Sequence, residues 1–304
     1  MSPVAESAVF EAPALPEWLD RQLPFKRYRV DIGAGLAMHV MEQGEGRPVL
    51  AVHGYPTWGY LYRRVARELR SEPFRVLMPD LVGFGMSDHP EDASWHTVES
   101  HSAALGTMID TLDLQDLIFV GQDWGGPIGS HALSSRADRV GGMVILNTSL
   151  GPPRPGFKPT SFHRFFGSAT GRAIARVLPL PQGALWLVQG DRASMKGEVG
   201  RAYRYPLQRR LGRAAVTGAI NMVPDSLSHD SIPALKVVED FMKGYRGPAQ
   251  IVWGMKDPVL GRLLNRISGL LPQAEVTKTD GGHFLQEEVP ADIAEAVRVV
   301  AASQ

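Results

Sequence analysis

The chain has 304 residues, of which 44% are hydrophobic, and it carries 32 basic and 32 acidic side chains. A chain of this length can bury one large core, and its balanced charge gives no overall field that favours nucleic acid or an anionic membrane as a partner. Because it contains no cysteine, disulfides, thiolate catalysis and cysteine-ligated metal sites are excluded.

The first 25 residues predict an irregular leader. They contain acidic residues and prolines, whereas a secretory signal needs a basic start and an uninterrupted apolar segment. No later stretch approaches the run of about 18 apolar residues that a membrane-spanning helix needs. We therefore expect a cytoplasmic protein with no membrane partner.

Strand-like and helix-like patterns then alternate along the chain. Residues 27–40 predict a hairpin that turns at Gly33 and Gly35. Buried strands are expected at residues 48–53, 74–78, 117–120 and 143–146, and helices at residues 61–69, 98–112 and from residue 128. This alternation is typical of the α/β class, in which helices cover both faces of a mostly parallel sheet.

The pattern breaks at the proline-rich segment GPPRP, residues 151–155, and returns near residue 237. Helices are then expected at residues 237–245, 265–271 and 291–302, and strands at residues 249–253 and 274–277. The roughly 80 residues between are helix-like and interrupted by prolines. We therefore predict a main domain of residues 1–150 and 233–304 with a helical cap, residues 151–232, inserted into it.

Positive charge is concentrated in the predicted cap. Residues 151–216 contain 12 Lys and Arg residues but only Asp191 and Glu198 as acids. A solvated polar face explains such a segment, and so does a surface that steers anionic ligands or binds a partner.

The motif GQDWGG, residues 121–126, directly follows a predicted strand and directly precedes a predicted helix. Glycine-x-nucleophile-x-glycine is the frame of the nucleophile elbow, a sharp strand-to-helix turn that exposes one side chain above the sheet edge. Asp123 occupies the place of the nucleophile. An Asp here could also be an ordinary helix N-cap, so other residues must decide between the two interpretations.

Two later residues favour the catalytic interpretation. Asp257 follows the strand expected at residues 249–253, and His283 lies on a loop after the last expected strand. Open α/β sheets place their sites at these strand ends. The order Asp123, Asp257, His283 matches the nucleophile, acid, histidine order of the α/β-hydrolase triad.

The segment HGYP, residues 53–56, follows the first of the predicted buried strands. In this fold that loop supplies one backbone N–H of the oxyanion hole, and the residue after the nucleophile supplies the other. We therefore assign the oxyanion hole to the N–H groups of Tyr55 and Trp124. His53 is interpreted as a structural histidine that bonds within its loop.

These segments resemble the haloalkane dehalogenases of the α/β-hydrolase superfamily. The resemblance is carried by HGYPTWGYLYRR (53–64), PDLVGFGMSD (79–88), FVGQDWGGPIG (119–129), ILNTS (145–149), WGMKDP (253–258) and GGHFLQEEVP (281–290). It covers roughly 220 residues of the main domain and is weak in the cap. It implies an α/β-hydrolase fold and carries the nucleophile over to Asp123. Members of that family differ in which of two strands the triad acid follows. With Asn147 at the earlier position and Asp257 at the later one, this chain resembles the subgroups that use the later position.

In that family the Trp after the nucleophile donates its indole N–H to the leaving halide, which implies this role for Trp124. Many members have Asn as a second halide ligand where this chain has Tyr55, and others use a Trp of the cap. Trp186 is the only Trp between residues 151 and 237. It is therefore the candidate second halide donor, with core packing as the alternative.

The resemblance implies hydrolysis of a small apolar halogenated substrate to alcohol, halide and proton, with water as co-substrate and no cofactor. Asp123 would displace the halide and form an alkyl ester, because an ionised carboxylate needs no base for that step. A water deprotonated by His283 would then hydrolyse the ester, with Asp257 orienting the histidine.

Epoxide hydrolase is the nearest alternative, since it has the same fold and an Asp nucleophile. It needs two cap tyrosines, and residues 151–237 offer only Tyr203 and Tyr205, which face different ways on a helix. A haloacetate dehalogenase would have Arg in place of Trp124. A non-enzymatic binding protein would have lost a triad residue, whereas all three are present. The nine histidines show no metal-ligand spacing, so no metal site is predicted.

Overall fold

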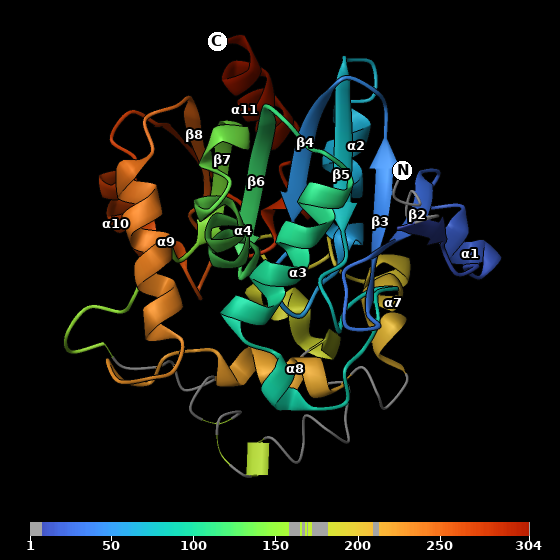
Figure 1. The fold of residues 1–304 in the computed structure, drawn as a ribbon, viewed down its shortest axis with the longest axis horizontal. Helices are drawn as coiled ribbons and strands as arrows, with labels where there is room; N and C mark the ends of the chain where they lie inside the picture. Colours follow the sequence, from blue (N-terminus) through green and yellow to red (C-terminus); the bar gives the residue numbers. More distant parts are fainter. Residues whose placement is uncertain are drawn as a thin grey trace, which may run out of the picture.

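The computed structural model describes residues 8–157, 165, 168, 170–171, 182–208 and 213–303. Its centre is a nine-stranded sheet in the order β1-β2-β3-β5-β4-β6-β7-β8-β9 (Figure 1). The strands are β1 (Val9–Glu11), β2 (Lys26–Asp31), β3 (Ala37–Gln43), β4 (Arg47–Val52), β5 (Phe74–Pro79), β6 (Leu117–Asp123), β7 (Val140–Thr148), β8 (Ala249–Gly254) and β9 (Glu275–Thr279). The first three strands pair antiparallel, as do β3 and β5, and all other neighbours pair parallel. This confirms the predicted mostly parallel sheet.

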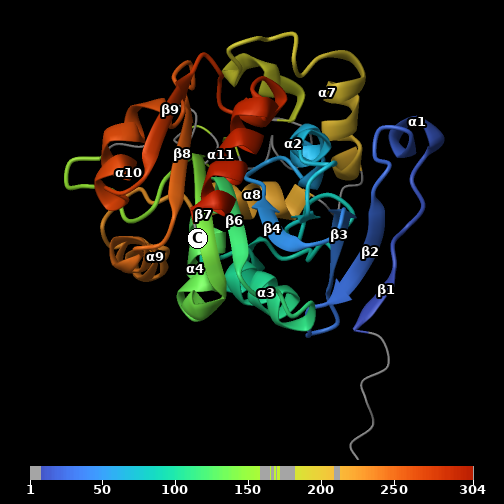
Figure 2. The same ribbon diagram turned by 90° about the horizontal axis from the view of Figure 1, so that it is seen from above.

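Helices cover both faces of the sheet. α3 (Val98–Thr111), α4 (Gly125–Ser134) and α9 (Ile232–Gly244) lie on one face, and α2 (Arg63–Glu68) and α11 (Pro290–Ala302) lie on the other (Figure 2). α10 (Leu264–Leu270) lies in the connection from β8 to β9, the last strand of the sheet. Because both faces are covered, the central strands are apolar throughout, and every residue of β7 after Val140 is buried.

The elements between β7 and α9 lie beyond one end of the sheet. They are η4 (Gln182–Val188), α7 (Gly197–Arg204), η5 (Pro206–Gln208) and α8 (Arg213–Asn221). Figure 1 shows α7 and α8 below the sheet, at the end where the parallel strands terminate. The other predicted cap residues, 158–164, 166–167, 169, 172–181 and 209–212, lie outside the described residues, and the predicted boundaries at 151 and 232 stay predictions.

Two sequence-based predictions need correction. Residues 8–25 are not irregular throughout, because β1 pairs antiparallel with β2 and α1 (Glu17–Asp20) buries Leu19. These elements have three and four residues, which is too short for a detectable periodicity. The helix expected at residues 237–245 begins earlier, at Ile232. Its Pro233 lies in the first turn, where a missing backbone N–H costs nothing.

The strand order places a topological switch at β4. From β4 the chain moves to β5 on one side and then returns to β6 on the other. Loops that leave adjacent strands in opposite directions open a crevice at the carboxyl ends of the strands, where open α/β sheets bind ligands. The loop after β4 begins at His53, and β6 ends at Asp123.

Short 3-10 turns complete the connections: η1 (Gly59–Tyr62), η2 (Ala93–Trp95), η3 (Ala137–Arg139), η7 (Gly261–Leu263) and η8 (Leu285–Glu287). Within the described ranges, each helix is too short or too polar to cross a bilayer.

Candidate active site

Asp123 lies at the junction of β6 and α4 with a backbone φ of +49°. This left-handed conformation is uncommon for a residue with a side chain and marks a constrained turn. The surroundings are crowded enough to require glycine: a Cβ on Gly54 would lie 2.2 Å from Cβ of Asp123, and one on Gly125 would lie 2.2 Å from the carbonyl oxygen of Val52. The predicted elbow is therefore present in the structure.

The structure brings the three predicted triad residues together. Nδ1 of His283 lies 2.9 Å from Oδ2 of Asp257, and Nε2 lies 3.6 Å from Oδ2 of Asp123. Asp257 also accepts hydrogen bonds from the side chain of Asn147, at 2.8 Å, and from the backbone N–H of Val259, at 2.7 Å. The buried Asp257 carboxylate thus has partners for both oxygens, as a buried charge requires.

The two carboxylates control the protonation of His283. Burial alone disfavours the imidazolium, but Asp257 and Asp123 outweigh this effect and raise the pKa of His283 to about 10. For Asp257, burial opposes ionisation, but the charge and the hydrogen bond of His283 lower the pKa of its carboxyl below the ordinary value. With both carboxylates ionised, the histidine therefore carries a proton at neutral pH.

One of the two predicted oxyanion-hole donors already points at Asp123. The backbone N–H of Tyr55 donates to Oδ1 of Asp123 at 2.8 Å. Trp124, the other predicted donor, is the N-cap residue of α4 and has a helical backbone conformation. His53 is fully buried, bonds to the carbonyl of Gly54 through Nδ1 and accepts the N–H of Leu81 at Nε2. It has the structural role that the sequence predicts, because both ring nitrogens are occupied.

Two cavities meet at Asp123 and Trp124. The smaller, of about 500 Å³, is lined by Tyr55, His283 and apolar side chains of η4 and α8, and the larger, of about 690 Å³, extends toward β7 and α10. Trp124 lines both cavities beside Asp123. Its indole N–H makes no hydrogen bond to a described residue, so this donor is available to a ligand in the apolar cavity.

Tyr55 and Trp186 do not supply a second such donor. The hydroxyl of Tyr55 is 2.8 Å from Nε2 of His101, and its ring stacks on Phe84. The indole N–H of Trp186 donates to the carbonyl of Gly183 in its own turn, at 3.2 Å. Trp186 also lies outside the described lining of both cavities. This geometry does not support its assignment to the halide site, because the turn already satisfies its N–H, and the assignment stays a prediction of the sequence.

The two cap tyrosines also point elsewhere. The hydroxyl of Tyr203 donates to the buried carboxylate of Glu287 at 2.6 Å, and the ring of Tyr205 packs edge-on against Trp18. Neither lines a cavity that contains Asp123. The paired donors that an epoxide oxygen would need are absent from this part of the described structure.

Residues that the sequence did not identify hold the histidine loop. Gln122 donates to the carbonyl of His283 at 3.0 Å. Gln189, from the segment after η4, bonds both the N–H and the carbonyl of Phe284, and His283 N–H donates to Val188. Gln122 could have been identified from the sequence, because it lies inside the elbow motif. Gln189 could not, because it lies in a segment without a motif. None of the described residues forms a group of three or more metal-ligating side chains.

Comparison with known proteins agrees with this geometry. Residues 47–290 match the alpha/beta hydrolase fold family. A haloalkane dehalogenase of Mycobacterium marinum is 31% identical over 285 residues, covering 90% of this chain and 93% of the relative. The structure of haloalkane dehalogenase DpaA from Paraglaciecola agarilytica superposes with a TM-score of 0.82 at 27% identity, covering 96% and 99% of the two chains.

The epoxide hydrolase CorEH also shares the fold, with a TM-score of 0.74 at 20% identity over 92% of this chain and all of that one. At this identity the likeness concerns the fold alone, whereas the dehalogenase relative is similar along nearly the whole of both sequences. The chain therefore belongs to the α/β-hydrolase fold family and, within it, to the haloalkane dehalogenases.

Proposed function

We propose that this protein hydrolyses carbon–halogen bonds of small apolar haloalkanes, with Asp123 as nucleophile, His283 as base and Asp257 as the acid that orients the histidine. The observation that carries the proposal is the surroundings of Asp123. Its carboxylate lies between a backbone N–H and a histidine, and Trp124 lines the same cavity. An ionised carboxylate and an adjacent halide donor are what displacement of a halide requires.

In the first step a carboxylate oxygen of Asp123 attacks the carbon that bears the halogen. A carbon–oxygen bond forms, the carbon–halogen bond breaks, and the electron pair leaves with the halide. Negative charge develops on the halogen in the transition state, and Trp124 N–H stabilises it there. Because the attacking oxygen is already ionised, no proton moves in this step.

Formation of the ester removes the negative charge of Asp123, which favours loss of the proton of His283 to solvent. In the second step Nε2 of the neutral His283 takes a proton from water, and the resulting hydroxide attacks the carbonyl carbon of the Asp123 ester. The N–H of Tyr55, which now bonds Oδ1 of Asp123, and the N–H of Trp124 stabilise the oxyanion. Collapse of the tetrahedral intermediate releases the alcohol and restores the carboxylate. Asp257 stabilises the imidazolium meanwhile, and the proton is passed to solvent.

The competing activity is epoxide hydrolysis, which shares the second step. A paired assay with 1,2-dibromoethane and styrene oxide separates the two. We expect bromide release with 2-bromoethanol as product and no phenylethanediol above background, because neither Tyr203 nor Tyr205 can donate to an epoxide from its present place. Diol formation faster than bromide release would contradict the proposal.

Cofactor-free catalysis, a cytoplasmic location and the limits of the cap at residues 151 and 232 stay predictions of the sequence. Loss of activity after dialysis against a metal chelator would contradict the first of them.

A further inference from the structure

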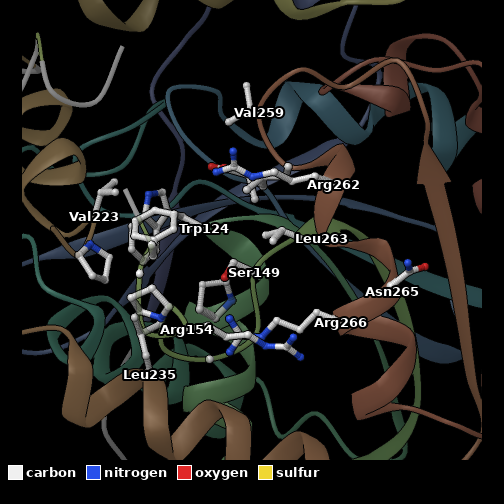
Figure 3. Close-up of a pocket in the computed structure, with 18 of the residues that line it drawn as sticks. Trp124, Ser149, Arg154, Val223, Leu235, Val259, Arg262, Leu263, Asn265 and Arg266 are labelled. Carbon is white, nitrogen blue, oxygen red and sulfur yellow. The ribbon is translucent and has the colours of Figure 1, made fainter. Parts of the chain in front are cut away.

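The larger of the two cavities has an unusual lining. Among the described residues around it, three are arginines, Arg154, Arg262 and Arg266, and Asp123 is the one acid. Figure 3 shows the three arginine side chains around the same cavity as Trp124, with those of Arg154 and Arg266 pointing toward one another. The arginines come from the loop after β7, from η7 and from α10.

These arginines are not neutralised equally. Arg266 lies 3.3 Å from Glu239, which also pairs with Lys243 at 3.2 Å. Arg154 and Arg262 are exposed and form no ion pair within the described ranges. Positive charge that no described acid neutralises favours an anion in the cavity that these arginines line.

Apart from the arginines, Asp123, Ser149 and Asn265, the described lining of this cavity is largely apolar. Leu235, Leu263 and Val223 line the cavity together with the proline residues of the loop after β7. A small inorganic anion would lose hydration against such walls, whereas a hydrocarbon chain would gain free energy there. The lining therefore matches a ligand with an apolar chain and an anionic end.

We propose that the protein also accepts ω-halogenated alkanoates, with the halogen-bearing carbon at Asp123 and Trp124, the chain along the apolar part of the lining, and the carboxylate attracted by the charges of Arg154 and Arg262, the two lining arginines without an ion pair among the described residues. The proposal rests on the proposed dehalogenase function and adds a substrate class to it. Guanidinium is suited to this role because its planar donors match a carboxylate.

The division of the two cavities supports this placement. His283 lines the smaller cavity, which has no arginine among its described residues, and does not line the larger one. A chain that lies in the larger cavity leaves the smaller one open, so that water can reach Nε2 of His283 after the ester has formed. A short neutral haloalkane needs only the smaller cavity.

The test compares 6-bromohexanoate with 6-bromohexanamide, which has the same chain and leaving group but no charge. Exposed ion pairs contribute roughly 0.2–1 kcal/mol each, equivalent to about a 3-fold change per arginine. The double variant Arg154→Gln/Arg262→Gln should therefore lower kcat/KM for the acid by about 10-fold, through KM, and change that for the amide by less than about 2-fold.

Two control variants isolate the effect. Arg154→Lys/Arg262→Lys keeps the charge without the planar fork and should retain most of the preference for the acid. Arg70→Gln removes an exposed arginine elsewhere on the surface and should leave the acid-to-amide ratio unchanged. An equal ratio in the parent and the double Gln variant would overturn the proposal.

A binding measurement separates this proposal from the dehalogenase function. Hexanoate should change the tryptophan fluorescence at lower concentration than hexanamide does, the double Gln variant should abolish the difference, and Trp124→Phe identifies the part of the signal that comes from Trp124. If neither brominated substrate releases bromide but hexanoate still binds preferentially, the dehalogenase proposal fails while the anion site stands. Equal affinity for hexanoate and hexanamide in the parent protein contradicts the anion site.

Discussion

Replacing His283 by alanine should separate the two half-reactions of the proposed mechanism. Formation of the ester on Asp123 needs no base, so the variant should release about one halide per active site and then stop. Removal of the imidazolium also removes a positive charge 3.6 Å from the Asp123 carboxylate, which makes that carboxylate no weaker as a nucleophile. The first step should therefore proceed at a rate similar to that of the parent.

The second step should slow by a factor of about 10² to 10⁴, the range for loss of a positioned general base. The fold should survive, because the side chain of His283 lines an existing cavity of about 500 Å³. The Asp257 carboxylate keeps its hydrogen bonds from Asn147, Val259 and Leu260, so no buried charge loses all its partners.

Rapid-mixing measurement of halide release gives the burst, and intact-mass analysis gives the adduct. With 1-bromobutane the variant should gain the mass of one butyl group in place of hydrogen, on the peptide that contains Asp123. Asp123→Ala is the control and should show neither burst nor adduct, with an unchanged circular dichroism spectrum. A His283→Ala protein that is folded but shows no burst and no adduct, while the parent turns over, would refute the two-step mechanism.

Three further predictions follow from the site. Trp124→Phe should slow single-turnover halide release by about 10-fold or more through loss of one transition-state hydrogen bond; an unchanged rate would remove Trp124 from the site. Because the pKa of His283 is raised from 6.5 to about 10, its contribution to stability is fully present below pH 6.5 and is lost as the pH approaches 10. Urea unfolding should therefore show the parent losing stability relative to His283→Ala over that range, and a pH-independent difference would contradict the raised pKa. Tyr203→Phe removes one hydrogen bond to buried Glu287 and should lower the free energy of unfolding by about 1–2 kcal/mol; a selective loss of epoxide turnover would instead identify Tyr203 as an epoxide ligand.

The residues of the triad could be predicted because the sheet imposes a simple rule. Parallel strands end at the same edge, so polar residues at the end of β6, shortly after β8 and on the loop after β9 must converge. Asp123, Asp257 and His283 satisfy this rule, and their positions can be read from the apolar runs that precede them. The same rule located Tyr55 after β4.

Contacts set by side-chain orientation could not be predicted in this way. The sequence shows that Trp186 is a cap tryptophan, but the local turn decides that its N–H reaches Gly183. The sequence also places Tyr55 at the position of a halide ligand, whereas its hydroxyl is fixed by His101, 46 residues away. Such pairings depend on long-range packing and carry no periodic signal.

In the proposed mechanism, the order of the two half-reactions follows from the charge on Asp123. While this carboxylate is ionised, it and Asp257 both raise the pKa of His283, so the resting histidine is protonated and cannot act as a base. Alkylation converts Asp123 into a neutral ester and removes one of these two charges. The pKa of His283 should then fall, because one of the two charges that oppose the effect of burial is gone. In the proposed mechanism this change favours the neutral histidine, the form that can deprotonate water, when an ester is present to be hydrolysed.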